Sequence, residues 1–563
     1  MTQVGLLGSG PAIEAANAAL GDTSAGAREI APASISTVDV AIAVGSVTDE
    51  DVRQIGAAAR GSEVVLVTVE LGGIGGVPVA GVDAAVAGLA PVTACFDCLQ
   101  RRVEAVDPDR DEGSTDPPTE RLAGAIAGRE VARLVGGAES SLLGGVIEIP
   151  HATRRILPVP NCECGDLPDR DLRLDSTERS LEDALAAAEN AFDARLGPIT
   201  SVGEVESFPV PYYLATLANA PFSDADVPDY AAGVALEWDP AFMKALGEAL
   251  ERYSAAIYLE DLLLTEPEAP VDPRGFVRPD ASDPDVRRWF PATNLSTDEA
   301  VALPAELVVF PPPERSIRPA ITTGLGLGNG GGEAVVSGLE EVIERDATML
   351  SWYSTYEPLE LVVDDENYRT LTRRASSEGL ETTALLLTQD VDVPVVGVCV
   401  HREDEWPKFA AGSAAALDPV EAARGAAEEA VQNWLELRRM GPDRASKESG
   451  SIGFHADFPD AAREFVDAET TIAAETVGPA DPPRGADALD PLVTRVEAAG
   501  LVPYAARVTP RDVESLGFEA VRVVVPEAQP LFTGDPYFGE RARHVPESLG
   551  FESRLDREMH PFP

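Results

Sequence analysis

The sequence predicts an α/β fold for the first part of the chain, followed by a larger part built around long amphipathic helices. Three observations lead to this prediction. Residues 1–90 alternate short β-branched runs with alanine-rich stretches, a pattern typical of strands and helices in a small, mostly parallel α/β domain. The 563 residues exceed the usual domain length of about 150 several-fold. Segments with an apolar and a polar helical face recur between residues 240 and 439.

The first elements follow from this alternation. The runs VGLLG (4–8), VDVAIAVG (38–45) and EVVLVTVEL (63–71) predict strands, and the stretches 12–20 and 49–59 predict the helices between them.

The first strand-to-helix turn reads GSGPAI, residues 8–13. It resembles a dinucleotide-binding G-x-G-x-x-G loop, but Ile13 replaces the third glycine and Pro11 removes an amide donor. We therefore interpret it as a tight turn and keep a dinucleotide site as the alternative.

Further along, turn-rich and charged stretches predict loops, and alanine-rich periodic ones predict helices. The expected loops are 106–120 and 165–178, the expected helices 120–134 and 181–195, and the expected surface insertions 441–460 and 478–491. We expect a first domain at 1–105, a linker and metal-binding segment at 106–200 that completes the N-terminal region, and a large domain at 201–563.

The charge of the chain is strongly negative. Lys and Arg number 44 against 96 Asp and Glu, a net charge of −52, and the only lysines are Lys244, Lys408 and Lys447. Such a surface repels phosphate backbones and anionic lipid, so we expect no nucleic-acid or membrane partner. Acidic groups along the whole chain resemble the composition of haloarchaeal proteins, whose self-repulsion is screened by molar salt; an acidic surface for a cationic partner is the alternative.

No apolar run of about 20 residues is present, and no basic region precedes the first strand. We expect a cytoplasmic protein without a transmembrane helix or signal peptide. Five cysteines are too few for a disulfide scaffold.

Four of the cysteines form two close pairs. Cys95 and Cys98 have C-x-x-C spacing, and Cys162 and Cys164 have C-x-C spacing. Two thiolate pairs supply the four soft ligands of a tetrahedral structural zinc, which would have no open position for catalysis. Reduced thiols or a redox pair remain the alternative. Cys399 lies in the apolar run VPVVGVCV, so we expect it to be a buried residue of a strand.

The helix that follows the glycine-rich run 324–332 has a chemically unusual polar face. At about 100° per residue, three glutamates, a hydroxyl and a guanidinium fall within roughly 120° of arc, namely Glu333, Ser337, Glu341, Glu344 and Arg345. The backbone amides of the glycine-rich run are suited to a phosphate. Taken alone, the same face is what a solvated helix of an acidic protein presents.

Two more helices carry related groups. Glu248, Glu251 and Arg252 repeat the pattern E-x-x-E-R near 240–259, and a helix near 419–439 carries a further set, Arg424, Glu428, Glu429 and Gln432. Hard oxygen ligands on converging helices suit Mg²⁺ bridging to nucleotide phosphates, and the arginines suit pairing with phosphate or glutamate. A P-loop ATPase is excluded, because no G-x-x-x-x-G-K-[ST] motif is present.

These three helices resemble the ATP-binding core of the YcaO family. The stretches that carry the resemblance are GVALEWDPAFMKALGEALERYSAAIY, TTGLGLGNGGGEAVVSGLEEVIERDATMLSWY and GSAAALDPVEAARGAAEEAVQ, supported by FEAVRVVVPEAQPLFTG and the terminal HPFP. The resemblance covers about residues 200–563 and implies a large α+β domain that uses ATP and Mg²⁺.

The resemblance also implies roles for individual residues. Magnesium would be held by Glu248, Glu251, Glu341, Glu344, Glu429 and Gln432. ATP would contact Asn329, Glu333, Ser337, Arg345, Arg252, Lys244 and Arg424. Two positions depart from the family pattern: Lys244 stands where serine is usual, and Gly425 where arginine is usual, with Arg424 one step away.

Family members resembling this chain phosphorylate a backbone amide oxygen of a ribosomal precursor peptide. In cyclodehydratases a Cys, Ser or Thr side chain attacks the preceding carbonyl and the product is a thiazoline or oxazoline. Their proline-rich tail reaches the active site, so His560 or the carboxylate of Pro563 would transfer a proton, against the alternative of a merely packed tail. Peptide thioamidation and a non-catalytic scaffold are the alternative functions.

The N-terminal region resembles the zinc-bearing, ThiF-like partner domains of such enzymes, on its α/β pattern and its two cysteine pairs. This resemblance implies a Rossmann-like domain for peptide recognition or docking. The family further implies a homodimer, and as additional partners a separate maturase protein or a dehydrogenase.

Overall fold

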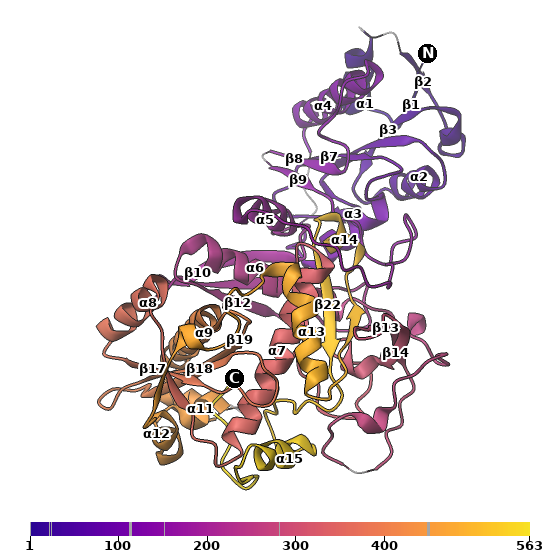
Figure 1. The fold of residues 1–563 in the computed structure, drawn as a ribbon. Helices are drawn as coiled ribbons and strands as arrows, with labels where there is room; N and C mark the ends of the chain where they lie inside the picture. The colour runs from indigo at the N-terminus through magenta and orange to yellow at the C-terminus, as the bar shows by residue number, and fades with distance from the viewer. Residues whose placement is uncertain are drawn as a thin grey trace.

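The structure is a computed structural model and describes residues 2–21, 23, 25–111, 115–150, 152–280, 282–447 and 451–563. The N-terminal part, indigo to purple in Figure 1, lies at one end of the molecule, and the larger remainder forms the other end. Among the described residues, no helix is both long and apolar enough to cross a membrane.

The N-terminal part is built on one seven-stranded sheet in the order β2-β1-β3-β4-β7-β8-β9. Its strands are β1 (Gln3–Leu7), β2 (Gly26–Glu29), β3 (Val40–Ser46), β4 (Val65–Leu71), β7 (Ala84–Leu89), β8 (Gly145–Ile149) and β9 (Ala152–Arg155). Neighbours from β2 to β4 are parallel, as expected from the sequence. From β4 to β9 they are antiparallel, so only half of the sheet is parallel. The chain doubles back after β4 through the small hairpin of β5 (Gly73–Ile74) and β6 (Val77–Pro78).

Helices cover both faces of this sheet. On one face α1 (Pro11–Leu20) and α4 (Pro117–Val135) lie side by side (Figure 1). Gly124 of α4 permits their close approach, because any larger residue there would place its Cβ 2.0 Å from the carbonyl oxygen of Ala12. On the other face α2 (Glu50–Arg60) and α3 (Phe96–Ala105) bury apolar side chains. The turn before α1 has Gly8 and Gly10 at φ 108° and 93°, which fits the expected tight turn.

Segment 106–200 contains more structure than the sequence indicated. Strands β8 and β9 complete the first sheet, and α4 begins at Pro117 within the expected loop, where the carboxylate of Asp116 accepts the amide of Thr119 at 2.9 Å. Residues 112–114 of that loop lie outside the described residues. The expected helix 181–195 ends early: α5 (Leu181–Ala188) passes into a short 3₁₀ turn, because Asp193 accepts two backbone amides and pairs with Arg154.

The described residues of the larger part form three sheets. They have the orders β10-β11-β12, β14-β13-β21-β22-β15 and β19-β18-β17-β16-β20. Their strands are β10 (Ile199–Glu206), β11 (Tyr212–Leu217), β12 (Tyr230–Val234), β13 (Trp289–Asn294), β14 (Ala300–Pro304), β15 (Leu325–Gly328), β16 (Leu359–Val362), β17 (Glu381–Leu386), β18 (Val395–His401), β19 (Phe409–Ala415), β20 (Thr471–Ala473), β21 (Tyr504–Arg507) and β22 (Glu519–Val524).

Three long helices pack on these sheets, α6 (Trp238–Ala256), α7 (Gly331–Trp352) and α9 (Pro419–Met440), each within a few residues of its expected bounds. Each packs on a strand that carries a glycine at the contact. A Cβ on Gly233 of β12 would lie 2.2 Å from the Ala245 nitrogen of α6. Gly326 of β15 and Gly412 of β19 make equally close approaches to α7 and α9. These glycines bring the helical backbones close to the sheets.

The remaining helices are α8 (Glu366–Ser377), α10 (Pro442–Ala445), α11 (Ser451–His455), α12 (Asp460–Val466), α13 (Leu489–Ala498), α14 (Arg511–Ser515) and α15 (Arg541–Ser548). The expected insertion at 441–460 is only partly at the surface. His455 is 1% exposed, packs edge-on against Trp352 and binds the carbonyl oxygen of Met559 at 2.7 Å. Residues 448–450 lie outside the described part.

The two parts share a core and a buried polar contact. One apolar cluster extends from α2 and α3 to α6 and the chain around Phe518. Within it Arg102 of α3 pairs with Asp512, and the hydroxyl of Tyr253 on α6 donates to Asp512 at 2.6 Å. All three side chains are at most 2% exposed. The N-terminal part is thus joined directly to helix α6.

Candidate functional site

A cavity of about 750 Å³ opens between α6, α7, α9 and strand β15. Its walls contain most of the residues expected at a nucleotide and magnesium site. These are Lys244, Glu248, Glu251, Arg252, Asn329, Glu333, Ser337, Glu341, Glu344, Arg345, Glu429, Gln432 and Pro563. The structure therefore brings together groups from three helices and the C-terminus, which are far apart in the sequence.

Arg345 lies at the centre of the acidic wall. Its guanidinium nitrogens are 3.2 Å from Glu344, 3.6 Å from Glu429 and 3.9 Å from Glu341. Burial lowers the pKa of Arg345, but the surrounding glutamates Glu344, Glu429 and Glu341 outweigh it and hold that pKa above its ordinary value. The arginine is fixed as a cation and holds carboxylates of α7 and α9 around it.

Ser413 of β19 links two of these carboxylates. Its backbone amide donates to Glu429 at 2.6 Å, and its hydroxyl donates to Glu344 at 2.6 Å. Burial, followed by repulsion from Glu429, raises the pKa of Glu344 to about 8 against the attraction of Arg345. Burial also raises the pKa of Glu429. The sequence interpretation missed Ser413, although it is the second residue of the stretch GSAAALDPVEAARGAAEEAVQ that carries part of the family resemblance.

The glutamates of α6 are held differently. Glu248 accepts the amide of Ala232 at 2.7 Å and pairs with Arg252. Glu251 has neither a hydrogen bond nor an ion pair among the described residues. Burial raises its pKa to about 8, with further repulsion from Glu341 and Glu248. Glu251 is half-buried, and a carboxylate partly withdrawn from water without a partner is costly, so this side of the cavity favours a bound cation.

Backbone contacts orient the remaining acidic groups. Glu341 accepts the amide of Gly324 at 2.9 Å. Glu333, in the first turn of α7, accepts both the backbone and the side-chain nitrogen of Asn329, at 2.9 and 3.0 Å. The segment before α7 is thus bound to the helix that it precedes.

Lys244 reaches across the cavity from α6 to α9. Its ammonium group pairs with Glu428, which also accepts the amide of Leu236 at 3.1 Å. Gly425 lines the cavity one turn before Glu428. Both departures from the family pattern therefore line the same cavity. Gly425 provides no positive charge on α9, and Lys244 of α6 places an ammonium group beside Glu428 of that helix.

Two expected site residues do not line the cavity. Arg424 points away from it and pairs with Asp365, the residue that caps α8. His560 is fully buried and its Nε2 lies 2.8 Å from the carbonyl oxygen of Phe532. Burial lowers the pKa of His560 to about 4. The last residue, Pro563, does line the cavity, and Phe562 before it is 0% exposed.

Three further polar residues of α7 and α9 line the cavity and were not expected from the sequence, Glu340, Asn433 and Glu436. Glu436 accepts from Gln432, one helical turn before it, at 3.1 Å and from the hydroxyl of Tyr212 at 3.2 Å. The helical period that placed the other glutamates puts Glu436 on the same polar face of α9, one turn after Gln432.

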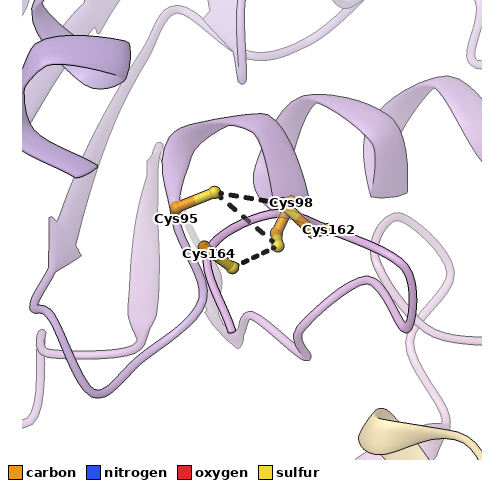
Figure 2. Close-up of side chains that lie close together, drawn as sticks. All are labelled: Cys95, Cys98, Cys162 and Cys164. Carbon is orange, nitrogen blue, oxygen red and sulfur yellow. Dashed lines mark hydrogen bonds between the residues drawn. The ribbon is translucent and has the colours of Figure 1, made fainter. Parts of the chain in front are cut away.

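The four expected cysteine ligands form a second cluster, between α3 and the loop after β9 (Figure 2). Their sulfur atoms all lie within 4.8 Å of one another. Cys95 is 3.8 Å from Cys98 and 3.6 Å from Cys162, and Cys98 is 3.5 Å from Cys164. All are free thiols. A tetrahedral metal with sulfur bonds of about 2.3 Å places its ligand sulfurs about 3.8 Å apart, so the cluster fits a single metal ion.

Two donors face the sulfurs of this cluster. The backbone amide of Val159 donates to Cys98 at 3.2 Å, and the guanidinium of Arg511 donates to Cys164 at 3.1 Å. N–H donors at sulfur stabilise the thiolate form that binds metal. The fifth cysteine, Cys399, is 0% exposed in β18, as expected.

Comparison with known proteins identifies a relative in sequence, solved structures with a similar fold, and a matching family. A protein of Methanothermobacter thermautotrophicus described as an uncharacterized protein is 34% identical over 209 residues, 35% of this chain and 54% of that protein. The chain thus matches only about half the length of this curated relative.

Two solved structures share the overall fold. A heterocyclase in complex with substrate and cofactor has a TM-score of 0.73 and 18% identity, over 98% of this chain and 83% of the other. The heterocyclase TruD has a TM-score of 0.61 and 18% identity, over 98% and 82%. Both likenesses include the N-terminal part.

One family model covers more than half of the chain, including all three helices around the cavity. The model described as "YcaO cyclodehydratase, ATP-ad Mg2+-binding" matches residues 232–529. The chain belongs to the YcaO family.

Proposed function

We propose that this protein uses ATP and Mg²⁺ to phosphorylate backbone amide oxygens of a ribosomal precursor peptide, and so forms thiazoline or oxazoline rings. The observation that carries the proposal is the cavity that carboxylates from three helices line, with those of α7 and α9 gathered around Arg345. The family description, which names ATP and Mg²⁺, and the fold shared with two heterocyclases support it. We assign this activity to residues 201–563.

The donor set of the cavity fits magnesium. Mg²⁺ prefers oxygen ligands and commonly joins carboxylates to nucleotide phosphates. Glu251 has a raised pKa of about 8 and no cationic partner at contact distance. A bound divalent cation would reduce the repulsion between its carboxylate and the neighbouring ones. We propose Glu248, Glu251, Glu341, Glu344, Glu429 and Gln432 as its binding residues. Bound Mg²⁺ would supply neutralisation of the charge that develops on the transferred phosphoryl group.

The nucleotide would occupy the same cavity. The carboxamide oxygen of Asn329, before α7, has no hydrogen-bond partner among the described residues, and Arg345, Arg252 and Lys244 offer positive charge. The volume of about 750 Å³ lies within the usual range for small-molecule sites. Arg424 is withdrawn to Asp365, so Lys244 is our candidate for the phosphate contact on the α9 side.

The proposed reaction replaces a poor leaving group with a good one. A Cys, Ser or Thr side chain of the peptide attacks the preceding carbonyl carbon and loses its proton. The resulting oxyanion takes the γ-phosphoryl group of ATP, releasing ADP. Loss of the amide proton and of inorganic phosphate then forms the C=N bond of the ring. The residues of the cavity contribute position and charge stabilisation.

The C-terminal tail supplies the candidate for proton transfer. Pro563 lines the cavity, and the buried Phe562 anchors it there. His560 is closed off from the cavity and its lowered pKa keeps it neutral at pH 7. We therefore assign the proton acceptor to the carboxylate of Pro563 and a positioning role to His560, which holds the tail against Phe532.

We further propose that the cysteine cluster holds a structural zinc ion. Four thiolates leave no open coordination position, so the metal would stabilise the junction of α3 with the loop that contains Cys162. The N-terminal part, which is joined to α6 through Arg102 and Tyr253, would then dock the peptide.

The test is incubation of the protein with candidate peptides, ATP and Mg²⁺, followed by mass spectrometry. Cyclodehydration predicts loss of one water per ring together with ADP and phosphate. Replacement of oxygen by sulfur, and only when a sulfide source is added, would favour the thioamidation alternative. Nucleotide binding without any turnover would favour the scaffold.

A further inference from the structure

The C-terminal tail is hydrogen-bonded to α7 and to α11 before it enters the cavity (Figure 1). The indole nitrogen of Trp352, the last residue of α7, donates to the carbonyl oxygen of Glu558 at 2.9 Å. The Nε2 of His455, the last residue of α11, lies 2.7 Å from the carbonyl oxygen of Met559. The second contact comes from the segment 441–460, which was expected to be a surface insertion.

The ring of His455 is enclosed and has a single polar contact. Trp352 and Phe454 pack edge-on against it, with ring centroids 5.5 and 5.0 Å away. A carbonyl oxygen only accepts, so Nε2 carries the proton. Burial, against the contact with Met559, lowers the pKa of His455 to about 4, so the ring is neutral at pH 7 and Nδ1 is unprotonated. Nδ1 has no hydrogen-bond partner among the described residues. Within the described part of the chain, the hydrogen bond of this ring therefore goes to the tail.

The segment that contains His455 is fixed to the sheet beside the cavity. The amide of Lys408 donates to the carbonyl oxygen of Ala456 at 2.8 Å. The rings of Phe458 and Phe409 stack with centroids 5.4 Å apart. Phe409 begins β19, the strand on which α9 packs and whose last residues line the cavity. His455 is thus held by the same sheet that supports the cavity.

The residues after Met559 link its position to the cavity. The carbonyl group of Met559 belongs to a planar peptide unit, so His455 fixes the orientation of that unit. Pro561 and Pro563 have a restricted φ, and a residue before proline is restricted to extended conformations. Phe562 is buried and Pro563 lines the cavity. A rotation of the peptide unit at Met559 therefore displaces the carboxylate of Pro563.

We propose that His455 is a positioning residue for the proposed reaction, which keeps the carboxylate of Pro563 in the cavity by donating to the carbonyl oxygen of Met559. The inference rests on the proposed function, in which that carboxylate accepts a proton. His455 itself does not line the cavity, so it acts through the tail. The segment 441–460, which had no assigned role, thereby contributes to the site.

Hydrogen–deuterium exchange with mass spectrometry tests the contact without ATP or peptide. His455→Leu removes the donor and should raise the exchange rate of the tail, residues 553–563, at least about tenfold. His455→Gln keeps an N–H donor at the end of the side chain and should recover most of the protection. The matched control is His401→Leu. His401 stacks on Phe458 at 5.1 Å but contacts the hydroxyl of Thr383, so this variant should keep the parent rate.

Peptide turnover measures the consequence for the reaction. His455→Leu should leave Mg-ATP affinity within about threefold but lower turnover at least about tenfold, since a misplacement of about 1 Å costs up to a hundredfold. His455→Gln should recover turnover. In a protein that lacks Pro563, His455→Leu should cause no further loss, because both changes then remove the same interaction.

Each of three results would overturn the proposal. Unchanged tail exchange in His455→Leu would mean that this histidine does not hold the tail. Faster tail exchange with the turnover of the parent would mean that the contact does not position a reacting group. A further loss of turnover in the protein without Pro563 would mean that His455 acts by another route. A parent protein without turnover would instead refute the proposed function, and the exchange measurement would still decide whether His455 holds the tail.

Discussion

Replacing Glu251 by Gln removes a half-buried carboxyl group that is repelled by Glu341 and Glu248. Its pKa of about 8 compares with an ordinary value of 4.5. Between pH 4.5 and 8 the folded protein therefore keeps a proton that the unfolded chain releases, and the stability associated with this proton declines as the pH rises and is lost above 8. At 1.36 kcal/mol per pKa unit, the difference corresponds to about 5 kcal/mol. Water in the cavity screens part of it, so we expect a difference of about 2–5 kcal/mol.

The assay is urea unfolding from pH 5 to 9 in magnesium-free buffer. No chelator is added, so that a metal at the cysteine cluster stays in place. Glu251→Gln should lose less stability than the parent as the pH rises and should be the more stable protein at pH 9. The exposed Glu497→Gln is the control and should follow the parent. Parallel profiles for the parent and Glu251→Gln would refute the reasoning. Mg-ATP should then stabilise the parent and not Glu251→Gln.

Three further predictions concern the rest of the molecule. Tyr253→Phe removes a buried hydroxyl that donates to Asp512 at 2.6 Å and should cost about 1.5–3 kcal/mol in urea unfolding; a cost below about 0.5 kcal/mol would contradict the structural role of the Arg102 contact. Cys98→Ser should lower the zinc content, measured by elemental mass spectrometry, well below one ion per chain and lower the thermal midpoint, and an unchanged content would exclude the four-sulfur site. Deletion of Pro563 should leave Mg-ATP affinity within about threefold, since about 0.7 kcal/mol is then lost, but reduce peptide turnover at least tenfold; equal losses in both would point to a packing role for the tail.

Much of the larger domain could be predicted because its helices carry local signals. The polar faces of α6, α7 and α9 follow from the 3.6-residue period, and the predicted bounds differ from the structure by only a few residues. The four cysteines could be grouped because close spacing constrains a loop to turn both sulfurs to one side. These features depend on neighbours along the chain.

Features that depend on distant contacts could not be predicted. The antiparallel half of the first sheet arises because the chain reverses between β4 and β7, and because β8 returns to pair with β7 after a long excursion through α3 and α4. Arg424 lies on the expected helix, but its side chain turns to Asp365 of another element. Ser413 reaches Glu344 and Glu429 only when β19 packs on α7 and α9. The burial of His560 depends on Phe532, far from it in the chain.

The central claim is that the acidic cavity binds Mg-ATP. Titration calorimetry in molar potassium chloride tests it most directly, with the parent, Glu344→Gln and the exposed Glu497→Gln as a matched control. We predict binding of one nucleotide per chain that requires magnesium, unchanged in the control and lost in Glu344→Gln. A parent protein that binds no nucleotide in the presence of magnesium, or a Glu344→Gln protein that binds as the parent does, would contradict the account.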